Sequence, residues 1–383
     1  MDKRVMRQDK TVYVGSDTFS FRVEKVPYKK YDNWLKMRKH LINTSDFTTH
    51  GFPYILQIEP TSFCNVSCDL CPAAVNRNEL HRPPRHMRFN EFKRLIDDVE
   101  DYLLYIILWD WGEPFMNPEL PDMISYASSK GIKIITSTNG TNLHDQALME
   151  VTLNSGLSAL IVAVDSLENK PYTGFRKGLR IEKVIDGLKK LVALKKQLKA
   201  DTLINLRMVI MKGNEHELPA IRRLAKKLKV DRFSVKTCNL THRFSFTNYP
   251  ELIPDNPKCR RYVYQEGSYE PVRIKAQCSV IWYMGFVHSD GDVVACGYDY
   301  TGKQLKAGNI FEKSFTQIWN GPEYQKLRRK IYHEKGPDFM CRECYVNFIP
   351  SGQGWFPEIC DFNRSFSRRI GAFCKKVIHN SII

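Results

Sequence analysis

The stretch YILQIEPTSFCNVSCDLCP, residues 54–72, joins a mostly apolar run directly to three cysteines. Its first part alternates apolar and polar side chains over a length typical of a short buried strand. Its second part has the spacing C-x3-C-x2-C at Cys64, Cys68 and Cys71. We therefore predict a strand over 54–59 whose carboxyl end leads into a metal-binding loop.

Outward from this stretch, short apolar runs alternate with amphipathic stretches as far as residue 235, which is the pattern of repeated βα units. Strands are predicted over 54–59, 104–109, 133–137, 160–164, 203–210 and 232–235. Helices are predicted over 90–102, 120–130, 181–196 and 217–228. Six units indicate an α/β fold, a partial (β/α)6 TIM-like barrel, in which ligands bind at the carboxyl ends of the strands.

The pattern also divides the chain into regions. The predicted regions are an N-terminal extension (1–50), the partial barrel (51–240), a linker (241–277), a small C-terminal α+β domain (278–350) and a basic amphipathic tail (351–383). The linker is predicted because prolines interrupt its sequence without a clear period.

The composition narrows the class of protein. A chain of 383 residues with 43% hydrophobic residues can bury a large core, and eleven cysteines in a chain of this length indicate metal or redox chemistry. The formal charge of +16 attracts anions, whether nucleic acid, phosphorylated molecules or an anionic membrane surface. The longest apolar run, 102–109, is too short to cross a bilayer, and no secretory signal is evident, so we expect a cytoplasmic protein.

Three thiolates on one short loop can converge on one metal centre. A structural zinc site uses four ligands, and no fourth cysteine or histidine follows the three until His81. A 4Fe-4S cube held by three cysteines instead leaves one iron open for a small-molecule ligand. The alternative interpretation is a structural zinc loop.

This loop, placed after the first strand of a partial barrel, resembles that of the radical S-adenosylmethionine (SAM) superfamily. The resemblance implies a 4Fe-4S cluster on the catalytic ligands Cys64, Cys68 and Cys71, with SAM bound to the open iron. It also implies that the reduced cluster cleaves SAM to a 5′-deoxyadenosyl radical, which removes a hydrogen atom from the substrate. A reducing electron donor such as flavodoxin or ferredoxin is then an expected partner.

Polar residues after later strands fit the same resemblance. The segment Trp111-Gly112-Glu113-Pro114 resembles the family's Gly-Gly-Glu-Pro segment, which binds the SAM ammonium group, with Trp111 in place of the first glycine. The SAM-binding residues that the resemblance implies are Gly112, Glu113, Ser137, Asn139, Asp165 and Ser166. Taken singly, such residues are more often ordinary turn residues.

A second set of cysteines lies near the C-terminus, at Cys278, Cys296, Cys341 and Cys344. Asp290-Gly291 predicts a hairpin, so Cys278 and Cys296 are expected on its two antiparallel strands. A helix predicted over 314–333 then returns the chain to the C-x2-C pair. Spacing alone leaves open whether these four ligands hold a fully ligated iron-sulfur cluster or a zinc ribbon.

The segment from Cys278 to Cys344 resembles the SPASM auxiliary-cluster extension, or its one-cluster form, Twitch. Residues 345–359 lack the further cysteines of the full form, so one auxiliary 4Fe-4S cluster is expected on the four cysteines. Such a cluster would accept an electron from the substrate, relay electrons or shape the pocket. Cys238 and Cys259 lie between the two sets and are either thiol hydrogen donors or inert buried cysteines.

The C-terminal residues form a basic amphipathic pattern. Phe362, Phe366, Ile370, Phe373 and Val377 share one helical face, with arginines and lysines on the others. Most such helices pack on their own protein, and the alternative is peripheral contact with an anionic membrane. Nucleic acid is not an expected partner, because the chain has no helix-turn-helix, RNA-binding or finger pattern.

The leading hypothesis is a radical SAM oxidoreductase or epimerase acting on a small polar substrate, sugar-like or lipid-linked. The rival enzyme is a peptide-modifying maturase of the thioether or epimerisation type, although about fifty residues before the barrel look short for a peptide-recognition domain. The rival from another class is a non-catalytic iron-sulfur or zinc interaction protein, which would form no 5′-deoxyadenosine from SAM.

Overall fold

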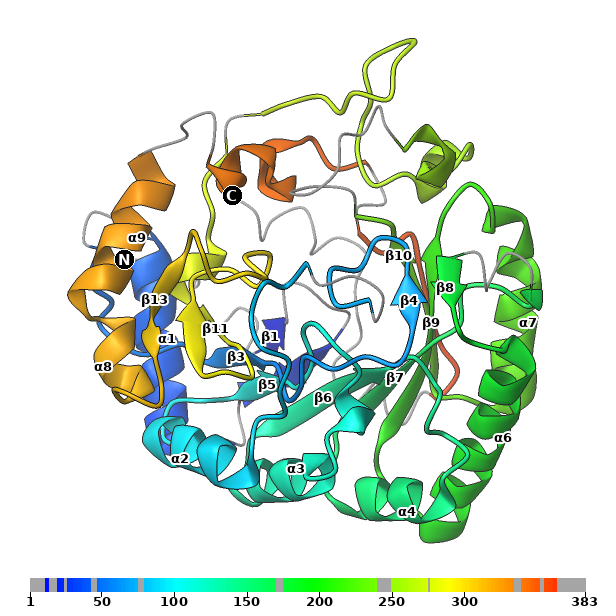
Figure 1. Ribbon diagram of the computed structural model, residues 1–383, viewed down its shortest axis with the longest axis horizontal. Coiled ribbons are helices and arrows are strands. Elements are labelled where there is room, and N and C mark those ends of the chain that lie inside the picture. Colours follow the sequence, from blue (N-terminus) through cyan, green and yellow to red (C-terminus); the bar gives the residue numbers. More distant parts are fainter. Residues whose placement is uncertain are drawn as a thin grey trace, which may run out of the picture.

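The computed structural model describes residues 11–13, 19–23, 26–42, 47–74, 79–169, 175–239, 249–274, 276–333, 339–351 and 355–363. Within these residues one ten-stranded sheet has the order β13-β12-β11-β3-β5-β6-β7-β9-β10-β14. Figure 1 shows helices α2, α3, α4, α6 and α7 arranged around the outside of this curved sheet.

The centre of the sheet is parallel and confirms the six predicted strands. These are β3 (Ile55–Ile58), β5 (Tyr105–Ile107), β6 (Lys133–Thr138), β7 (Ala159–Ala163), β9 (Leu203–Ile210) and β10 (Arg232–Thr237). Every neighbouring pair from β3 to β10 is parallel, and the strands are buried almost throughout. The structure is therefore an α/β partial barrel, and its strands gather their carboxyl ends at one edge.

The connections between these strands are helical. They are α2 (Phe89–Val99), α3 (Leu120–Ser129), α4 (Gln146–Asn154), α6 (Ile181–Leu198) and α7 (Leu218–Leu228), with short 3-10 turns η3 (Pro114–Met116) and η4 (Glu215–Glu217). The four predicted helices are confirmed, and α4 was missed. Its N-cap is Asp145, whose side chain accepts a hydrogen bond from the Leu148 N–H at 3.0 Å.

The second cysteine region extends the same sheet. It supplies β11 (Met284–Val287), β12 (Asp292–Val294) and β13 (Lys306–Asn309), and β11 pairs in parallel with β3. The predicted hairpin between β11 and β12 is confirmed, with Gly291 at φ 86° in its turn. The prediction that Cys278 and Cys296 lie on these strands was wrong, since Cys278 precedes β11 and Cys296 follows β12.

The helix predicted over 314–333 is two helices. The structure has α8 (Phe315–Trp319) and α9 (Pro322–His333), separated at Asn320-Gly321. Proline favours the first turn of a helix and cannot continue one from within, because it lacks an N–H. The sequence therefore contained the signal for the break. Short 3-10 turns lie on either side of this pair, at η8 (Val280–Trp282), η9 (Met340–Glu343) and η10 (Tyr345–Asn347).

The residues before β3 form a small hairpin and one helix. The hairpin pairs β1 (Thr11–Tyr13) with β2 (Ser20–Arg22), and α1 covers Tyr28–Ile42. The Asn33 amide donates to the carbonyls of Phe52 and Tyr102, just before β3 and β5. Helix α1 therefore packs against the amino-terminal edge of the sheet, opposite the strand ends that carry the cysteine loop.

The chain after β10 contains short turns and one final strand. Between β10 and η8 the described elements are η6 (Pro250–Leu252) and η7 (Pro257–Cys259), and β14 (Glu358–Asp361) pairs antiparallel with β10. The predicted amphipathic helix beginning at Phe362 lies outside the described residues, apart from positions 362 and 363. Among the helices that the structure describes, none has the length and apolar content to cross a membrane.

Candidate active site and cluster sites

The first three cysteines lie on the loop that follows β3. This loop contains β4 (Ser67–Cys68), which forms a two-residue antiparallel pair with β8 (Arg176–Lys177). The Cys71 N–H donates to the Cys68 carbonyl at 3.1 Å, which turns the loop between its second and third cysteine. The loop is therefore held at the carboxyl edge of the barrel by strand pairing (Figure 1).

The three thiols form one electrostatic group. Burial raises the pKa of Cys64 to about 11 and that of Cys71 to about 12, and the Cys68 thiol adds to both shifts. Burial also raises the pKa of Cys68, while the Arg176 guanidinium opposes this shift. Three grouped thiols are the donor set that an iron-sulfur cluster uses, and binding requires that they lose their protons. The described residues contain no group of three His, Cys, Asp or Glu side chains that could hold a single metal ion. The loop therefore suits an iron-sulfur cluster by the type of its donors and by their grouping.

Gly112 packs directly against the start of the cysteine loop. It has φ 98°, and a Cβ at this position would overlap the Thr61 carbonyl and lie 2.8 Å from the Phe63 carbonyl. The Glu113 N–H donates to the same Phe63 carbonyl at 2.8 Å. Only glycine combines this backbone conformation with so close an approach. The predicted SAM segment is therefore built against the residue that precedes Cys64.

Glu113 joins the ends of two strands. Its carboxylate accepts hydrogen bonds from Thr138 Oγ1 at 2.8 Å and from the Asn139 N–H at 2.7 Å. The side chain is buried, and burial raises the pKa of Glu113 to about 7. Since both oxygens are engaged by the protein, this carboxylate positions the end of β6 whether or not it also contacts SAM.

Asn139 connects the end of β6 to the cysteine loop. Its amide donates to Asn65 Oδ1 at 2.8 Å, and the Asn65 amide donates to Thr141 Oγ1 at 2.9 Å. Asn65 directly follows Cys64 and was not singled out in the sequence. Ser137, on β6, is half-buried. The structure therefore brings Glu113 and Asn139 to the cluster loop by direct hydrogen bonds.

Asp165 lies just past the end of β7 and is paired with an arginine from the cysteine-loop hairpin. Arg176 Nε donates to Asp165 Oδ2 at 2.6 Å, and the Asp165 side chain is 3% exposed. The other carboxylate oxygen accepts from the Val209 N–H at 2.8 Å. Because Arg176 also hydrogen-bonds Cys68, one guanidinium links the predicted metal ligand to the predicted SAM residue.

Ser166 has a structural partner. Its hydroxyl donates to Glu217 Oε1 at 2.5 Å, and the Leu167 N–H donates to the other oxygen of Glu217 at 2.6 Å. Asn214 adds a hydrogen bond to the Asp165 carbonyl at 2.8 Å. Polar residues at the start of the η4–α7 segment therefore fix the turn after β7.

The buried carboxylate of Glu59 also has an arginine partner. Both Arg82 terminal nitrogens bind the Glu59 oxygens, at 2.8 and 2.5 Å, and the Ser289 hydroxyl donates to Oε1 at 2.6 Å. Glu59 directly follows β3, Arg82 follows the cysteine loop, and Ser289 lies in the β11–β12 turn. No sequence spacing indicates that these three residues meet.

The second cysteine set gathers beyond β11 and β12. Burial raises the pKa of Cys296 well above its usual value, and Cys344 and Cys278 add to the shift. The Asn347 amide donates to the Cys341 carbonyl at 2.6 Å, which shapes the C-x2-C turn. Thiols from three segments, those of Cys278, Cys296 and Cys344, thus approach one region, and Cys341 lies one turn before Cys344. Four thiol donors fit a fully ligated cluster.

Trp111 joins the two cysteine regions. Its indole N–H donates to the Gly297 carbonyl at 3.0 Å, and its ring packs edge-on against Tyr300. Gly297 directly follows Cys296, so the residue that replaces the first glycine of the SAM segment contacts the second cysteine region. The Trp111 side chain therefore forms a contact between the two cysteine regions.

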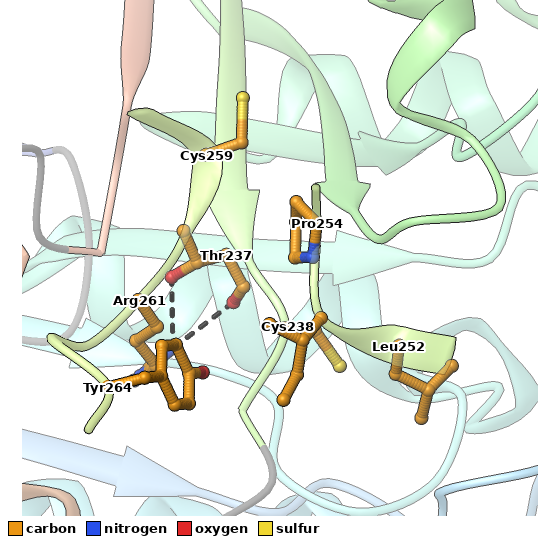
Figure 2. Close-up of a pocket in the computed structure, with 8 residues that line it drawn as sticks. Thr237, Cys238, Leu252, Pro254, Cys259, Arg261 and Tyr264 are labelled. Atoms are coloured by element: carbon orange, nitrogen blue, oxygen red, sulfur yellow. Dashed lines mark hydrogen bonds between the residues drawn. The ribbon is translucent and has the colours of Figure 1, made fainter. Parts of the chain in front are cut away.

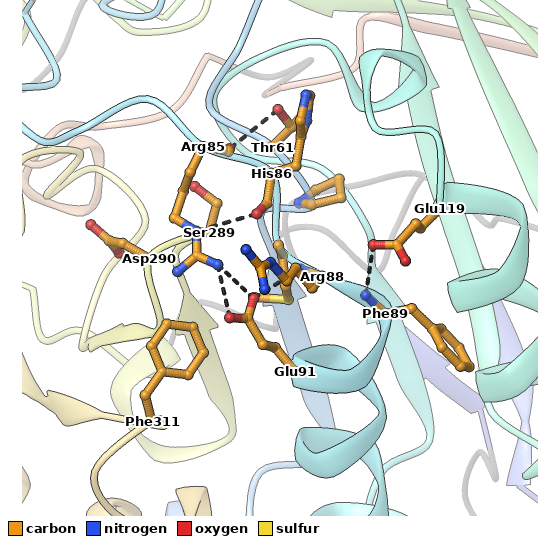
Figure 3. A network of polar contacts seen from close by, with 12 residues as sticks. Thr61, Arg85, His86, Arg88, Phe89, Glu91, Glu119, Ser289, Asp290 and Phe311 are labelled. Carbon is orange, nitrogen blue, oxygen red and sulfur yellow. Dashed lines mark hydrogen bonds and ion pairs between the residues drawn. The ribbon is translucent and has the colours of Figure 1, made fainter.

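The segment that leads into the cysteine loop is anchored from outside the barrel (Figure 3). The Ser62 N–H donates to the Arg85 carbonyl at 3.1 Å, and the Arg85 N–H donates to Ser62 Oγ at 2.9 Å. The Arg85 guanidinium binds Glu91 at 2.7 Å and lies 5.1 Å from the ring centroid of Phe311. These contacts tie the loop to α2 and to the residues after β13.

The fold and the two thiol groups define an iron-sulfur protein built on a partial barrel. Family models match residues 58–225 as the radical SAM superfamily and residues 278–345 as SPASM, an iron-sulfur cluster-binding domain. The chain is therefore a radical SAM enzyme with a SPASM domain. These domains imply SAM and two 4Fe-4S clusters, one that binds SAM and one auxiliary.

Similar proteins differ in what they act on. The chain is 25% identical over 313 residues to the AdoMet-dependent heme synthase of Methanosarcina barkeri, covering 72% of this chain and 85% of that one. It is 24% identical to the PqqA peptide cyclase of Granulibacter bethesdensis, covering 76% and 79%. The structure of Streptococcus suis SuiB bound to SAM aligns with TM-score 0.58 and 18% identity, covering 82% and 74%, which supports the fold.

Proposed function

We propose that this radical SAM enzyme oxidises or epimerises a small polar, sugar-like or lipid-linked molecule at a C–H bond. The observation that carries the proposal is the direct packing of Gly112 and Glu113 against the loop that bears Cys64. In that arrangement Cys64, Cys68 and Cys71 would hold the cluster that binds SAM. When bound, this cluster and SAM supply a 5′-deoxyadenosyl radical that removes a hydrogen atom from the substrate.

The residues around the cysteine loop have distinct proposed roles. Gly112 and Glu113 would receive the SAM ammonium group, with Ser137, Asn139, Asp165 and Ser166 near its ribose and carboxylate. The Glu113 and Asp165 carboxylates are already oriented by hydrogen bonds from the protein, at 2.6 to 2.8 Å for the closest donors. Fixed acceptors of this kind cost little reorganisation when a cationic group binds.

The second cysteine set would hold the auxiliary cluster on Cys278, Cys296, Cys341 and Cys344. Its proposed role is to take the substrate's electron in a net oxidation, because a fully ligated cluster has no position for SAM. The Trp111–Gly297 hydrogen bond supports this role, since it joins the SAM segment to the residue after Cys296. Hydrogen return to the substrate radical would instead give an epimerisation.

The test is the formation of 5′-deoxyadenosine by anaerobically reconstituted protein supplied with SAM and a low-potential reductant. We expect the product with the wild-type chain and none with Cys64→Ala. The Cys360→Ala variant is the matched control, because Cys360 belongs to neither cysteine set and should not alter the yield. Failure of the wild-type protein to form 5′-deoxyadenosine would contradict the proposed function.

A peptide maturase is the second candidate, favoured by the similarity to the PqqA peptide cyclase. The described residues before β3 comprise only a short hairpin and α1, and α1 packs on the sheet edge opposite the cysteine loop. Cell extract separated into a small-molecule fraction and a peptide fraction distinguishes the two. We expect the small-molecule fraction to increase 5′-deoxyadenosine formation, and an increase with the peptide fraction alone would favour the maturase.

A further inference from the structure

Arg261 is a buried arginine without a carboxylate partner among the described residues. Arg261 is 2% exposed, and its Nη1 donates to the carbonyl and the hydroxyl of Thr237 at 3.1 and 3.4 Å. Nε and Nη2 have no hydrogen-bond partner. The guanidinium carbon lies 4.2 Å from the ring centroid of Trp355. The charge is therefore packed between aromatic and backbone groups, with two donors unused.

Several other arginines that are largely removed from solvent bind a carboxylate. Arg82, Arg176 and Arg232 each bind a carboxylate, from Glu59, Asp165 and Asp361 respectively. Arg328, also buried, donates through Nε and Nη1 to the carbonyls of Ile281 and Phe47 and to the Asn320 side chain. An unpaired buried charge is costly, so it is usually compensated by an anion.

Two segments that adjoin described neighbours of Arg261 in the sequence contain no acidic residue. Residues 240–248, which follow Asn239, and residues 352–354, which precede Trp355, contain no aspartate or glutamate. The Cys238 thiol is not a substitute, because burial raises the pKa of Cys238 to about 12 even though the Arg261 charge opposes this shift. Because no carboxylate of the described residues pairs with Arg261, a bound ligand is the source of the anion that we consider.

Arg261 lines a small cavity at the carboxyl end of β10 (Figure 2). Thr237, Cys238 and Tyr264 line it together with Arg261, and Leu252 and Pro254 contribute apolar surface. Its volume of about 10 Å³ has room for one water-sized group. The cavity therefore suits the terminal oxygen of a ligand whose remainder lies outside it.

The cavity and the proposed SAM residues share an edge of the barrel. Cys238 directly follows β10, and Asp165 follows β7 only two strands away in the sheet. The Asp165 carboxylate contributes to the electrostatic environment of Cys238. Carboxyl ends of parallel strands are where ligands of such folds bind.

We infer that Arg261 binds an anionic group of the substrate, a carboxylate or a phosphate, through its two unused N–H donors at the carboxyl end of β10. The inference rests on the proposed function, because it assigns a substrate class to that same barrel mouth. Arginine suits this task because its planar fork can offer two parallel N–H groups to either oxyanion. The substrate class is thereby narrowed to polar molecules that carry an acid group.

The experiment measures the thermal stability of reconstituted holoenzyme in phosphate, in acetate and in chloride at equal ionic strength, without SAM or reductant. At tenfold excess over Kd, a bound anion should raise Tm by about 2 °C relative to chloride. Phosphate and acetate distinguish the two kinds of acid group. We expect Arg261→Gln to lose this rise and Arg261→Lys to keep part of it, while Arg223→Gln, which changes an exposed arginine of α7, keeps all of it.

Two results would overturn the inference. The first is a wild-type protein whose Tm is the same in all three salts, and the second is an Arg261→Gln variant that responds as the wild type does. The lysine variant guards against misfolding, because it retains the charge. Failure of the proposed function would appear separately, as absence of 5′-deoxyadenosine from the wild-type enzyme.

Discussion

At the scale of single residues, Arg176 interacts with two acidic groups, the Asp165 carboxylate and the Cys68 thiol. Its Nε binds the buried Asp165 carboxylate at 2.6 Å, and its charge opposes the burial that raises the Cys68 pKa. A thiol must become a thiolate to ligate iron, so a nearby cation favours the ligating form. Arg176 therefore positions a proposed SAM residue and favours ionisation of a proposed metal ligand.

We expect Arg176→Gln to destabilise the protein by about 3 kcal/mol, because it leaves the buried Asp165 carboxylate without its cation. Chemical denaturation measures this change in the free energy of unfolding. The matched control is Lys177→Gln at the next position, where the ion pair with Asp69 is 55% and 38% exposed and contributes less than about 1 kcal/mol. Equal effects of the two substitutions would contradict the role given to Arg176.

At the scale of elements, the contact between the Gly112 turn and the cysteine loop sets the geometry of the site. The turn follows β5 and the loop follows β3, and these strands are neighbours. Gly112 meets the Thr61 and Phe63 carbonyls, and no larger residue fits. The cysteine loop is therefore held by the Gly112 turn after β5 and by the hydrogen bonds of Arg85 with Ser62.

Gly112→Ala should destabilise the protein by more than about 2 kcal/mol and reduce its iron content, because the methyl group must displace backbone. Gly131→Ala is the matched control, since Gly131 also has positive φ, at 67°, but has open space around it. Its cost should be about 1 kcal/mol, from the backbone conformation alone. Thermal unfolding and iron analysis of both variants check the comparison, and a loss of iron in Gly131→Ala alone would contradict it.

Helix α1 buries Lys30, for which the described residues provide no ion pair. Lys30 is 3% exposed, its Nζ donates to the Lys130 carbonyl at 2.8 Å, and burial lowers the pKa of Lys30 to about 8, with Glu100 opposing. Since the unfolded pKa is 10.5, the unfolded chain binds this proton more readily. The folded state is therefore penalised fully below pH 8, and the penalty disappears as the pH rises to about 10.5.

Lys30→Met should therefore raise the free energy of unfolding at pH 7 by about 1 to 2 kcal/mol, with a smaller gain at pH 10. Denaturant unfolding at the two pH values measures this difference. The control is Lys29→Met on the same helix, where the ion pair with Asp101 is exposed to solvent, so the stability should stay nearly unchanged. A gain that is the same at both pH values would contradict the account of Lys30.

The elements that the sequence predicted are those with a strong local period. The six strands were predictable because each contains a short run rich in apolar residues, as expected for strands of a buried parallel sheet. The break between α8 and α9 was signalled by Gly321-Pro322 but was missed because the apolar spacing continues across it. Pairs such as Asp165–Arg176 and Glu59–Arg82 could not be predicted, since they depend on how separate segments meet in space.

At the scale of the whole molecule, one sheet supports both cysteine sets. Strand β11 pairs with β3, so the second cysteine region is built onto the strand that leads into the first cysteine loop. The sequence predicted two separate regions, and their boundaries stay a prediction. The spacing of residues could not indicate this shared strand pairing. It also could not indicate the Trp111–Gly297 hydrogen bond between the two cysteine regions.

The central claim is that the chain carries two 4Fe-4S clusters, and metal analysis of anaerobically reconstituted protein tests it most directly. We predict about eight irons per chain, twice the content of one cube, and no stoichiometric zinc. Replacing Cys64, Cys68 and Cys71 by alanine, or Cys341 and Cys344 by alanine, should each leave about four. A wild-type content near four irons with one zinc per chain would contradict the claim.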